Sequence, residues 1–221
     1  TYDTIWTGDL NSDWATAGNW SNGMPTAGQD VLIADVANAP IIGSSATVNL
    51  GNLIISEANE LSVASGGSLI VNGISTGNVT FNRNLGASKW YLVSSPVSGQ
   101  AYNDAYITAN GIASGTGNNR GITSYATADN TWSYLQSGGS GTFNNGQGYS
   151  LKRSATGNIS FTGTINTSDV SVAVSNAGNG FNLIGNPFTS HVNSATFLGD
   201  NSANLISETL WVWNQGTSSY E

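Results

Sequence analysis

Apolar residues recur at a fixed interval in the first third of the chain. From residue 55 to residue 79 every eighth residue is apolar, and a second apolar residue stands two positions before the first three of these. The positions are Leu53, Ile55, Leu61, Val63, Leu69, Val71 and Val79. The stretches between them, EANE, ASGG and NGISTG, are rich in turn-forming residues. The pattern predicts short strands with one apolar face, arranged either as a meander or as successive faces of a small β-solenoid.

The rest of the chain also favours strands. Polar and apolar residues alternate in VSVAV (170–174) and NISFTGTI (158–165), which is typical of strands. Few stretches of ten residues lack both Gly and β-branched residues. Helical turns are expected only near 101–108 and 194–206, so the sequence predicts an all-β protein.

One stretch of the chain occurs in two similar copies. WYLVSSPVSG (90–99) matches FNLIGNPFTS (181–190), with Pro96 aligned to Pro187. Farther on, YATADNTWSY (125–134) resembles WNQGTSSYE (213–221), and both patterns predict an aromatic hairpin. The chain therefore contains an internal repeat.

These patterns predict two domains. Residues 1–82 form a small unit of short strands, and the segment Gly77 to Arg83 is the joining strand. Residues 83–221 form a β-sandwich built from two related halves, about 88–165 and 179–221.

The second half of the repeat lacks strands that the first half has. The first copy continues into GQGYSLKR (146–153) and GNISFTGTI (157–165), and the second copy has no counterpart. We therefore expect another segment to complete the sheet edge at 210–221. This segment is either the continuation of the same chain or a strand from another copy. The predicted edge residues are Leu210, Val212, Trp213 and Tyr220.

Near the N-terminus, the residues Asp9, Asn11 and Asp13 have the alternate spacing of a calcium-binding loop. The rest of that motif is missing, because Trp14 stands where a Gly is needed and Trp20 where a bidentate Glu is needed. The alternative is that these Asp and Asn side chains cap turns.

Three tryptophans lie in the same stretch: Trp6, Trp14 and Trp20. Indole rings stack on sugars, so Trp14 and Trp20, with Trp132 of the predicted hairpin, are candidates for glycan stacking. The favoured interpretation for the N-terminal three is that they plug the end of a β core, because large aromatic side chains bury much apolar area.

The composition of the chain disfavours several classes of partner and of activity. The 221 residues include 13 acidic and five basic residues, a formal net charge of −8. Nucleic acid and anionic membranes are therefore disfavoured as partners, and no apolar run is long enough to span a membrane. There is no cysteine, His191 is the only histidine, and no GxSxG motif occurs. Nothing here suggests a reaction, and we expect no enzyme.

Several longer stretches resemble the large secreted surface proteins of flavobacteria and other Bacteroidota. They are WTGDLNSDWATAGNWSNGMP, GNVTFNRNLGASKWYLVSSPVSG, GQGYSLKR, ISFTGTINTSDV and FNLIGNPFTS. The resemblance implies export by the type IX secretion system and a secreted, extracellular or cell-surface location. It also implies O-glycosylation at Asp-Ser/Thr-apolar sequences. DTI (3–5) is the clear match, so Thr4 is the candidate; the alternative is an unmodified Thr in a first strand.

Two classes of function follow. The first is a structural or adhesive surface protein, such as a filament or surface-layer subunit or a fragment of a larger adhesin, which pairs with copies of itself or with its own continuation. The second is a carbohydrate-binding module of a secreted polysaccharide-degrading enzyme. The first predicts buried aromatics and a large apolar contact, and the second predicts exposed, coplanar aromatics.

Overall fold

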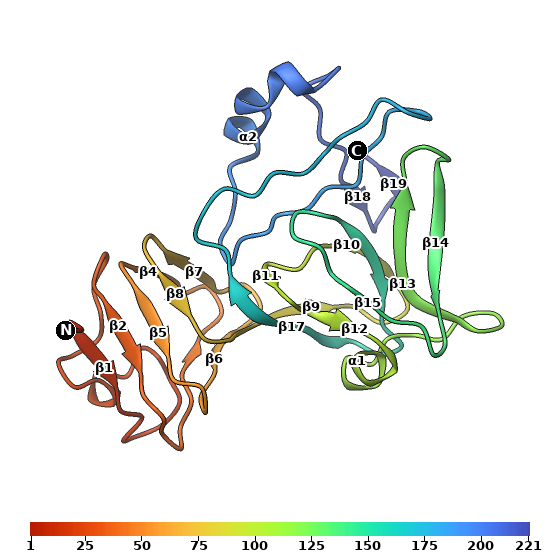
Figure 1. Ribbon diagram of the computed structural model, residues 1–221. Coiled ribbons are helices and arrows are strands. Elements are labelled where there is room, and N and C mark those ends of the chain that lie inside the picture. The colour runs from red at the N-terminus through yellow and green to blue at the C-terminus, as the bar shows by residue number, and fades with distance from the viewer.

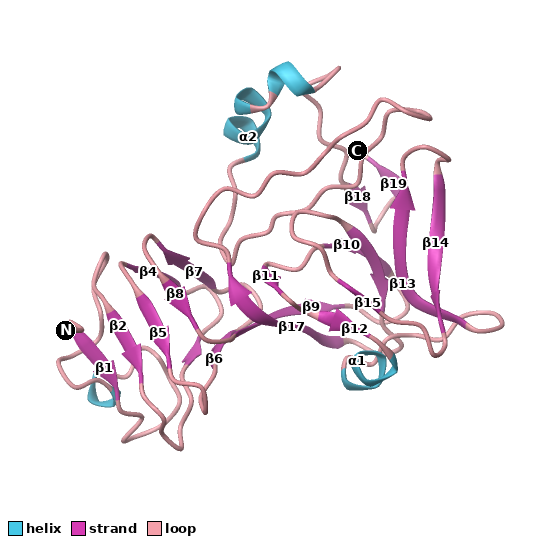
Figure 2. Ribbon diagram, in the orientation of Figure 1, coloured by secondary structure: helices cyan, strands magenta, loops and turns pink.

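The computed structural model describes all 221 residues and consists mainly of short strands (Figures 1 and 2). The all-β prediction is confirmed. Two α-helices occur, α1 (Asp104–Ala109) and α2 (Ser194–Asp200), with 3-10 turns at Ala17–Asn19 and Ser202–Asn204. Each α-helix begins after an Asn whose side chain accepts a hydrogen bond from a backbone N–H in the first turn. Both helices lie in the regions where the sequence predicts helical turns.

The N-terminal unit is a solenoid of parallel strands rather than a meander. One sheet contains β1 (Thr4–Trp6), β2 (Val31–Ile33), β5 (Leu53–Ile55) and β8 (Ser75–Thr76), all paired in parallel. Val31 pairs with Leu53 and Leu53 with Ser75, a step of 22 residues. Thr4 pairs with Val31, so the first turn is longer, at 27 residues. Successive parallel pairing of this kind means that each strand lies on the corresponding strand of the previous turn.

Two further sheets form the other faces of the solenoid. In one, β4 (Thr47–Leu50) pairs with β7 (Ser68–Val71). In the other, β3 (Ile41–Ile42) pairs with β6 (Leu61–Val63), and β6 pairs with β9 (Val79–Leu85). The first two eight-residue steps thus lead from one face to the next, from β5 to β6 and from β6 to β7, whereas the step from Val71 to Val79 passes over the short strand β8. The apolar residues that carry the pattern are all buried.

The N-terminal loop closes one end of the solenoid. Trp20 bridges to Trp6 of β1, and Asp13 bridges to Ile41 of β3. The edges of two sheets are therefore covered by residues 12–21. We call this segment the cap.

Strand β9 connects the solenoid to the rest of the molecule. One of its edges pairs in parallel with β6, and the other pairs with β17 (Gly157–Ile165) in antiparallel over seven residue pairs. The predicted joining strand, Gly77 to Arg83, overlaps β9. The five-stranded sheet β11-β17-β9-β6-β3, with β11 at Val97–Ser98, crosses the boundary placed at residue 82, and one core of 28 residues contains members from both sides.

A second antiparallel sheet packs on this core. Its order is β10 (Trp90–Val93), β16 (Tyr149–Lys152), β13 (Asn119–Ala126) and β14 (Thr131–Gln136). A short pair, β12 (Ala101–Tyr102) and β15 (Gly141–Thr142), lies beside α1. The inner face of the four-stranded sheet carries buried residues such as Val93, Ile122 and Leu151. We call the opposite side the outer face; by register it carries Trp90, Leu92, Thr123, Tyr125, Trp132, Tyr134, Ser150 and Lys152.

The C-terminal segment, residues 166–221, contributes little regular structure (blue in Figure 1). Its only strands are β18 (Trp213–Asn214) and β19 (Ser219–Tyr220), and none of the 28 core residues lies in it. The predictions of a strand at 170–174 and of a second sandwich half in strands are wrong. No neighbouring strand offers these residues a ladder, so their alternating pattern leaves Val172 and Val174 exposed.

Thr189 anchors the C-terminal segment to the solenoid. Its backbone carbonyl accepts a hydrogen bond from Leu69 N, and its Oγ1 donates to Leu69 O over 2.7 Å. The side chain is buried. We expect Thr189→Val to lower the free energy of unfolding by about 1 to 3 kcal/mol, because the buried Leu69 carbonyl loses its donor while the side-chain shape is kept. Urea unfolding measures this, and exposed Thr196→Val is the control. Equal stability of Thr189→Val and wild type would show that this contact does not hold the segment.

Candidate functional site

The hairpin β18–β19 is the only regular β structure of the C-terminal segment. Trp213 pairs with Tyr220, and their ring centroids are 5.1 Å apart. Val212 and Glu221 extend the hairpin through two backbone hydrogen bonds. The prediction of a hairpin at this position is confirmed.

The second predicted hairpin, β13–β14, has the same local geometry. Tyr125 pairs with Trp132 at 5.2 Å between ring centroids. In each hairpin the second aromatic residue follows the first by seven positions, and the residue two before it has a positive φ: 55° at Asn130 and 54° at Ser218. A non-glycine residue in this conformation is uncommon, so the two hairpins share a specific turn.

The predicted edge residues are largely exposed. Val212 is 64% exposed, and Leu210 and Tyr220 are also among the exposed large side chains, whereas Trp213 is half-buried. Two residues that the sequence pattern did not single out, Ile206 and Trp211, are 83% and 55% exposed. Trp211 belongs to the apolar run 210–213 that leads into β18, and this run was its signal. Ile206 is separated from the run by three polar residues and had no such signal.

Tyr220 and the polar atoms of the hairpin indicate a partly covered environment. Partial burial, followed by the nearby Tyr125, raises the pKa of Tyr220. The hairpin therefore lies toward the Tyr125 end of the outer face. Trp213 Nε1 and Gln215 Nε2 are buried and have no hydrogen-bond partner, which is unfavourable for each group.

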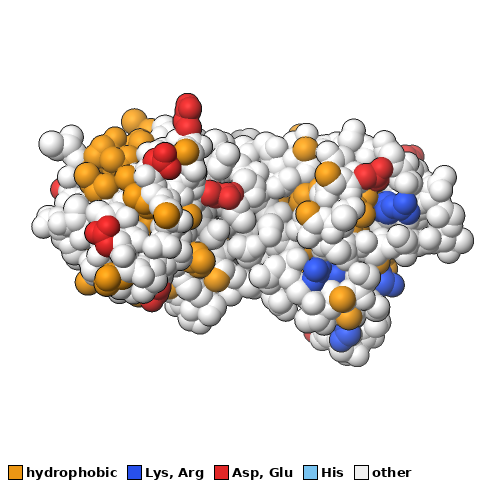
Figure 3. Space-filling view, turned by 90° about the horizontal axis from the view of Figure 1, so that it is seen from below, with side chains coloured by type: hydrophobic (Ala, Val, Ile, Leu, Met, Phe, Trp, Pro, Cys, Tyr) orange, Lys and Arg blue, Asp and Glu red, His pale blue; other side chains and the backbone are white.

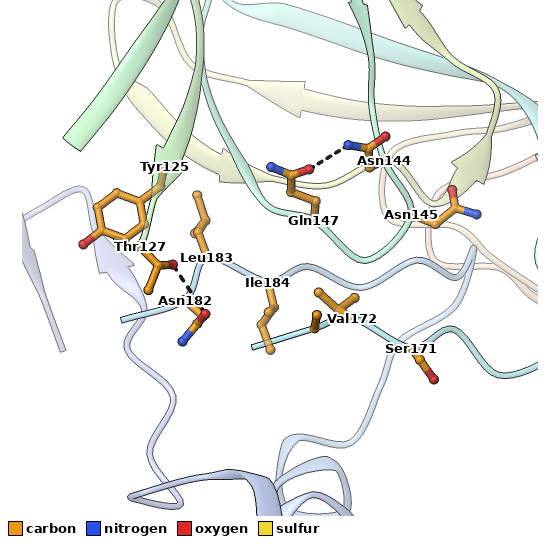
Figure 4. A pocket seen from close by; sticks show the side chains of 11 residues that line it. Tyr125, Thr127, Asn144, Asn145, Gln147, Ser171, Val172, Asn182, Leu183 and Ile184 are labelled. Carbon is orange, nitrogen blue, oxygen red and sulfur yellow. Dashed lines mark hydrogen bonds between the residues drawn. The ribbon is translucent and has the colours of Figure 1, made fainter. Parts of the chain in front are cut away.

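A groove of about 330 Å³ lies between the four-stranded sheet β10-β16-β13-β14 and the C-terminal segment (Figure 4). One wall is formed by Ile184, which pairs with Gln147 as an antiparallel bridge. The other is formed by Val172 and its neighbours, which are in no strand. Several amides of the groove bond within the protein: Asn144 Nδ2 donates to Gln147 Oε1, and Thr127 Oγ1 to Asn182 Oδ1. The groove thus has on one side a segment that is in no strand.

The assignment of Trp14 and Trp20 to glycan stacking is wrong. They are 4% and 5% exposed, and they pack with fully buried Trp6, at centroid distances of 4.6 Å between Trp14 and Trp20 and 5.0 Å between Trp6 and Trp20. The favoured interpretation as core is confirmed for these three. Trp132 is half-buried against Tyr125, so stacking there stays a prediction.

Thr4 is not accessible as a glycosylation site in this fold. It is 2% exposed in β1, and its Oγ1 donates a hydrogen bond to Gly23 O and accepts one from Asn22 N. A glycan on Oγ1 would displace the strand. The alternative, an unmodified Thr in the first strand, agrees with the structure.

Asp9, Asn11 and Asp13 use their oxygens within the loop. Asn11 Oδ1 accepts hydrogen bonds from Asp13 N and Asn19 Nδ2, and Asp13 Oδ1 accepts one from Ala15 N. Asp9 Oδ2 accepts from Thr7 Oγ1. This is the capping alternative, and no three His, Cys, Asp or Glu residues are grouped as metal ligands. His191 is exposed in the C-terminal segment.

The helices of this fold are too short and too polar to cross a bilayer.

Comparison with known proteins gives one match. Residues 5–78 are similar to a family described as a domain of unknown function (DUF8693). These residues span the cap and most of the solenoid. No curated protein and no solved structure matches the chain.

Proposed function

We propose that the protein is a non-catalytic structural or adhesive component of an extracellular surface. In this proposal, a β-strand from a second copy completes its C-terminal segment. One observation carries the proposal: the buried core ends at Ile165, whereas the last 56 residues expose a series of large apolar side chains. They are Val172, Val174, Phe181, Val192, Ile206, Leu210, Trp211, Val212 and Tyr220.

The backbone supports the same idea. Residues 170–174 and 210–212 have apolar, strand-favouring sequences but lie in no strand. Unpaired strand edges accept incoming strands through backbone hydrogen bonds, and alternate side chains provide specificity. Both edges of the β18–β19 pair lack a further strand, so the hairpin is a suitable acceptor.

An incoming strand from a second copy would use a different surface on each partner. Such a head-to-tail contact propagates and forms a filament unless it closes into a ring. The low fraction of charged residues also suits close packing of copies. Location outside the cell, and export by the type IX route, belong to the same proposal and rest on the sequence motifs.

The carbohydrate-binding-module alternative loses most of its support. Two of the three aromatics proposed to stack on sugar, Trp14 and Trp20, are buried in the core. A sugar platform therefore cannot be built from the cap.

Association of the purified protein tests the proposal. We expect concentration-dependent oligomers by light scattering coupled to size exclusion, and filaments by electron microscopy. Val212→Glu should weaken association by about tenfold or more, because burying one such side chain contributes about 1.5 to 3 kcal/mol. Ile74→Glu, an equally exposed apolar position in the solenoid, is the matched control and should associate like wild type.

Two outcomes would change the interpretation. A wild-type chain that stays monomeric at the highest attainable concentration contradicts the proposal. If a longer polypeptide that contains residues 1–221 is a compact monomer, while residues 1–221 alone associate, the completing strand belongs to the same chain.

A further inference from the structure

A second groove, of about 210 Å³, lies on the outer face at the end away from the C-terminal hairpin. It is formed by Trp90 of β10, Tyr134 of β14, Lys152 of β16, and residues 113–116 and 119–121. These residues come from all four strands of the sheet and from the loop before β13. None of its lining residues is acidic.

Two aromatic rings form the floor of this groove. Trp90 and Tyr134 belong to the two opposite edge strands, yet their ring centroids are 6.0 Å apart in an edge-to-face contact. On the two central strands this face carries the small residues Thr123 and Ser150, together with Lys152 beside Trp90. Thr123 and Ser150 are themselves buried. Tyr134 is nevertheless 44% exposed, so part of the aromatic surface is open.

Two cations stand beside these rings. Lys152 pairs with Trp90 across the strands, and its Nζ lies 5.9 Å from the centre of the Trp90 ring. The Arg120 side chain donates through Nη1 to the carbonyls of Asn118 and Asn119. That contact fixes the guanidinium by one nitrogen, and Nε and Nη2 are left for a ligand.

The charges of the chain are unevenly distributed. All five basic residues lie between positions 83 and 153, a region that contains only two of the 13 acidic residues. In Figure 3 the Lys and Arg atoms gather over one part of the molecule, whereas acidic atoms are spread mainly over the other. The groove itself is lined by two basic residues, Arg120 and Lys152, and by no acidic residue.

The loop before β13 supplies hydrogen-bonding groups at the rim. Ser114 and Thr116 are exposed and line the groove. The loop is closed by a hydrogen bond from Gly115 N to Asn119 O and by a bridge between Ser114 and Arg120. Its hydroxyl groups are therefore held next to the two cations.

We propose that this groove binds one anionic sugar residue, carboxylated or sulfated, of an acidic polysaccharide. A pyranose ring has an apolar C–H face that packs on an aromatic ring. Arg120 would pair with the carboxylate or sulfate through two parallel hydrogen bonds, and Lys152 would add a point charge. Ser114 and Thr116 would bond to ring hydroxyl groups. The proposal is independent of strand completion, which involves the opposite end of the outer face.

Binding of defined oligosaccharides tests this inference by calorimetry and by tryptophan fluorescence. The probes are oligogalacturonides, which carry carboxylates, and oligosaccharides of sulfated galactan. The methyl ester of the same oligogalacturonide is the uncharged control. We expect binding of at least one charged probe, weakened by salt because the charges are near the surface, and at least tenfold weaker binding of the ester.

Matched variants distinguish binding in this groove from nonspecific electrostatic attraction to the protein. Arg120→Gln and Lys152→Gln should each weaken binding by about tenfold. Lys89→Gln makes the same charge change next to Trp90 but outside the lining residues, and should change affinity less than twofold. If Arg120→Gln loses folded structure by circular dichroism, Lys152→Gln, which breaks no strand pairing, decides the matter.

Three results would overturn the inference. They are the absence of binding by both charged probes, equal binding of the ester, and an equal loss of affinity in Lys89→Gln.

Discussion

Trp6→Ala should unfold the cap and the first turn of the solenoid. Trp6 is fully buried, packs against Trp14 and Trp20, and donates from Nε1 to Asn38 O over 2.7 Å. Removing a buried Trp side chain typically lowers the free energy of unfolding by about 3 to 5 kcal/mol. Here the Asn38 carbonyl also loses its donor. We therefore expect an effect at or above the upper end of that range.

Urea unfolding followed by tryptophan fluorescence and circular dichroism measures this change. Ile74→Ala is the control, because it removes an exposed side chain from the same unit and surface substitutions usually change stability by less than about 0.5 kcal/mol. Trp6→Phe should recover part of the loss, since it refills most of the volume without the Nε1 donor. A Trp6→Ala variant as stable as wild type would mean that the three indoles do not form a core.

Asn19→Leu should destabilise the cap by about 2 to 5 kcal/mol, because the Asn19 side chain hydrogen-bonds to backbone groups that would otherwise have no partner. Asn19 is completely buried. Its Oδ1 accepts from Leu10 N and Asn11 N, and its Nδ2 donates to Asn11 Oδ1 and Asp13 O. One side chain thus satisfies four groups of the loop, and leucine of similar volume satisfies none.

Asn19→Asp separates the two halves of this network. The carboxyl keeps an acceptor for Leu10 N and Asn11 N. Near pH 4 its protonated form has one O–H donor in place of the two N–H donors of the amide, so the stability of the variant should fall between wild type and Asn19→Leu. Its stability should decrease further as the carboxyl ionises, because ionisation removes the last donor and places a charge in the core. Thermal unfolding over a pH series measures it. If Asn19→Leu retained wild-type stability, the loop would be held by the indoles alone.

The sequence pattern identified the buried positions of the solenoid but not its topology. Leu53, Leu61 and Leu69 are apolar because each faces the interior, and that is a local property that the alternation of a strand reveals. Which strand lies beside which depends on contacts 22 residues apart. A meander and a solenoid bury the same residues, so only the parallel register of Val31, Leu53 and Ser75 distinguishes them.

The candidate sites show a related limit. The sequence alone does not show whether a tryptophan packs in a core or faces solvent. Trp14 and Trp20 are buried because the cap that carries them packs on Trp6 at the end of the solenoid. The edge at residues 210–221, by contrast, was predicted from an internal repeat that can be read directly in the sequence. The groove at Trp90 was not foreseen, because Arg120, Tyr134 and Lys152 come together through the strand order of the sheet and not through any spacing.

The cap makes the two ends of the solenoid different. A solenoid whose last turn is bare can extend by stacking another copy on its end, which is why natural solenoids carry closing elements. Here residues 12–21 cover strand edges at one end and β17 covers β9 at the other. The ends of the solenoid are therefore covered in part, because β8 still has no strand on its outer side. If copies join through the C-terminal hairpin, as proposed, a chain of copies would carry its solenoids as side arms, with their capped ends free to meet the surroundings.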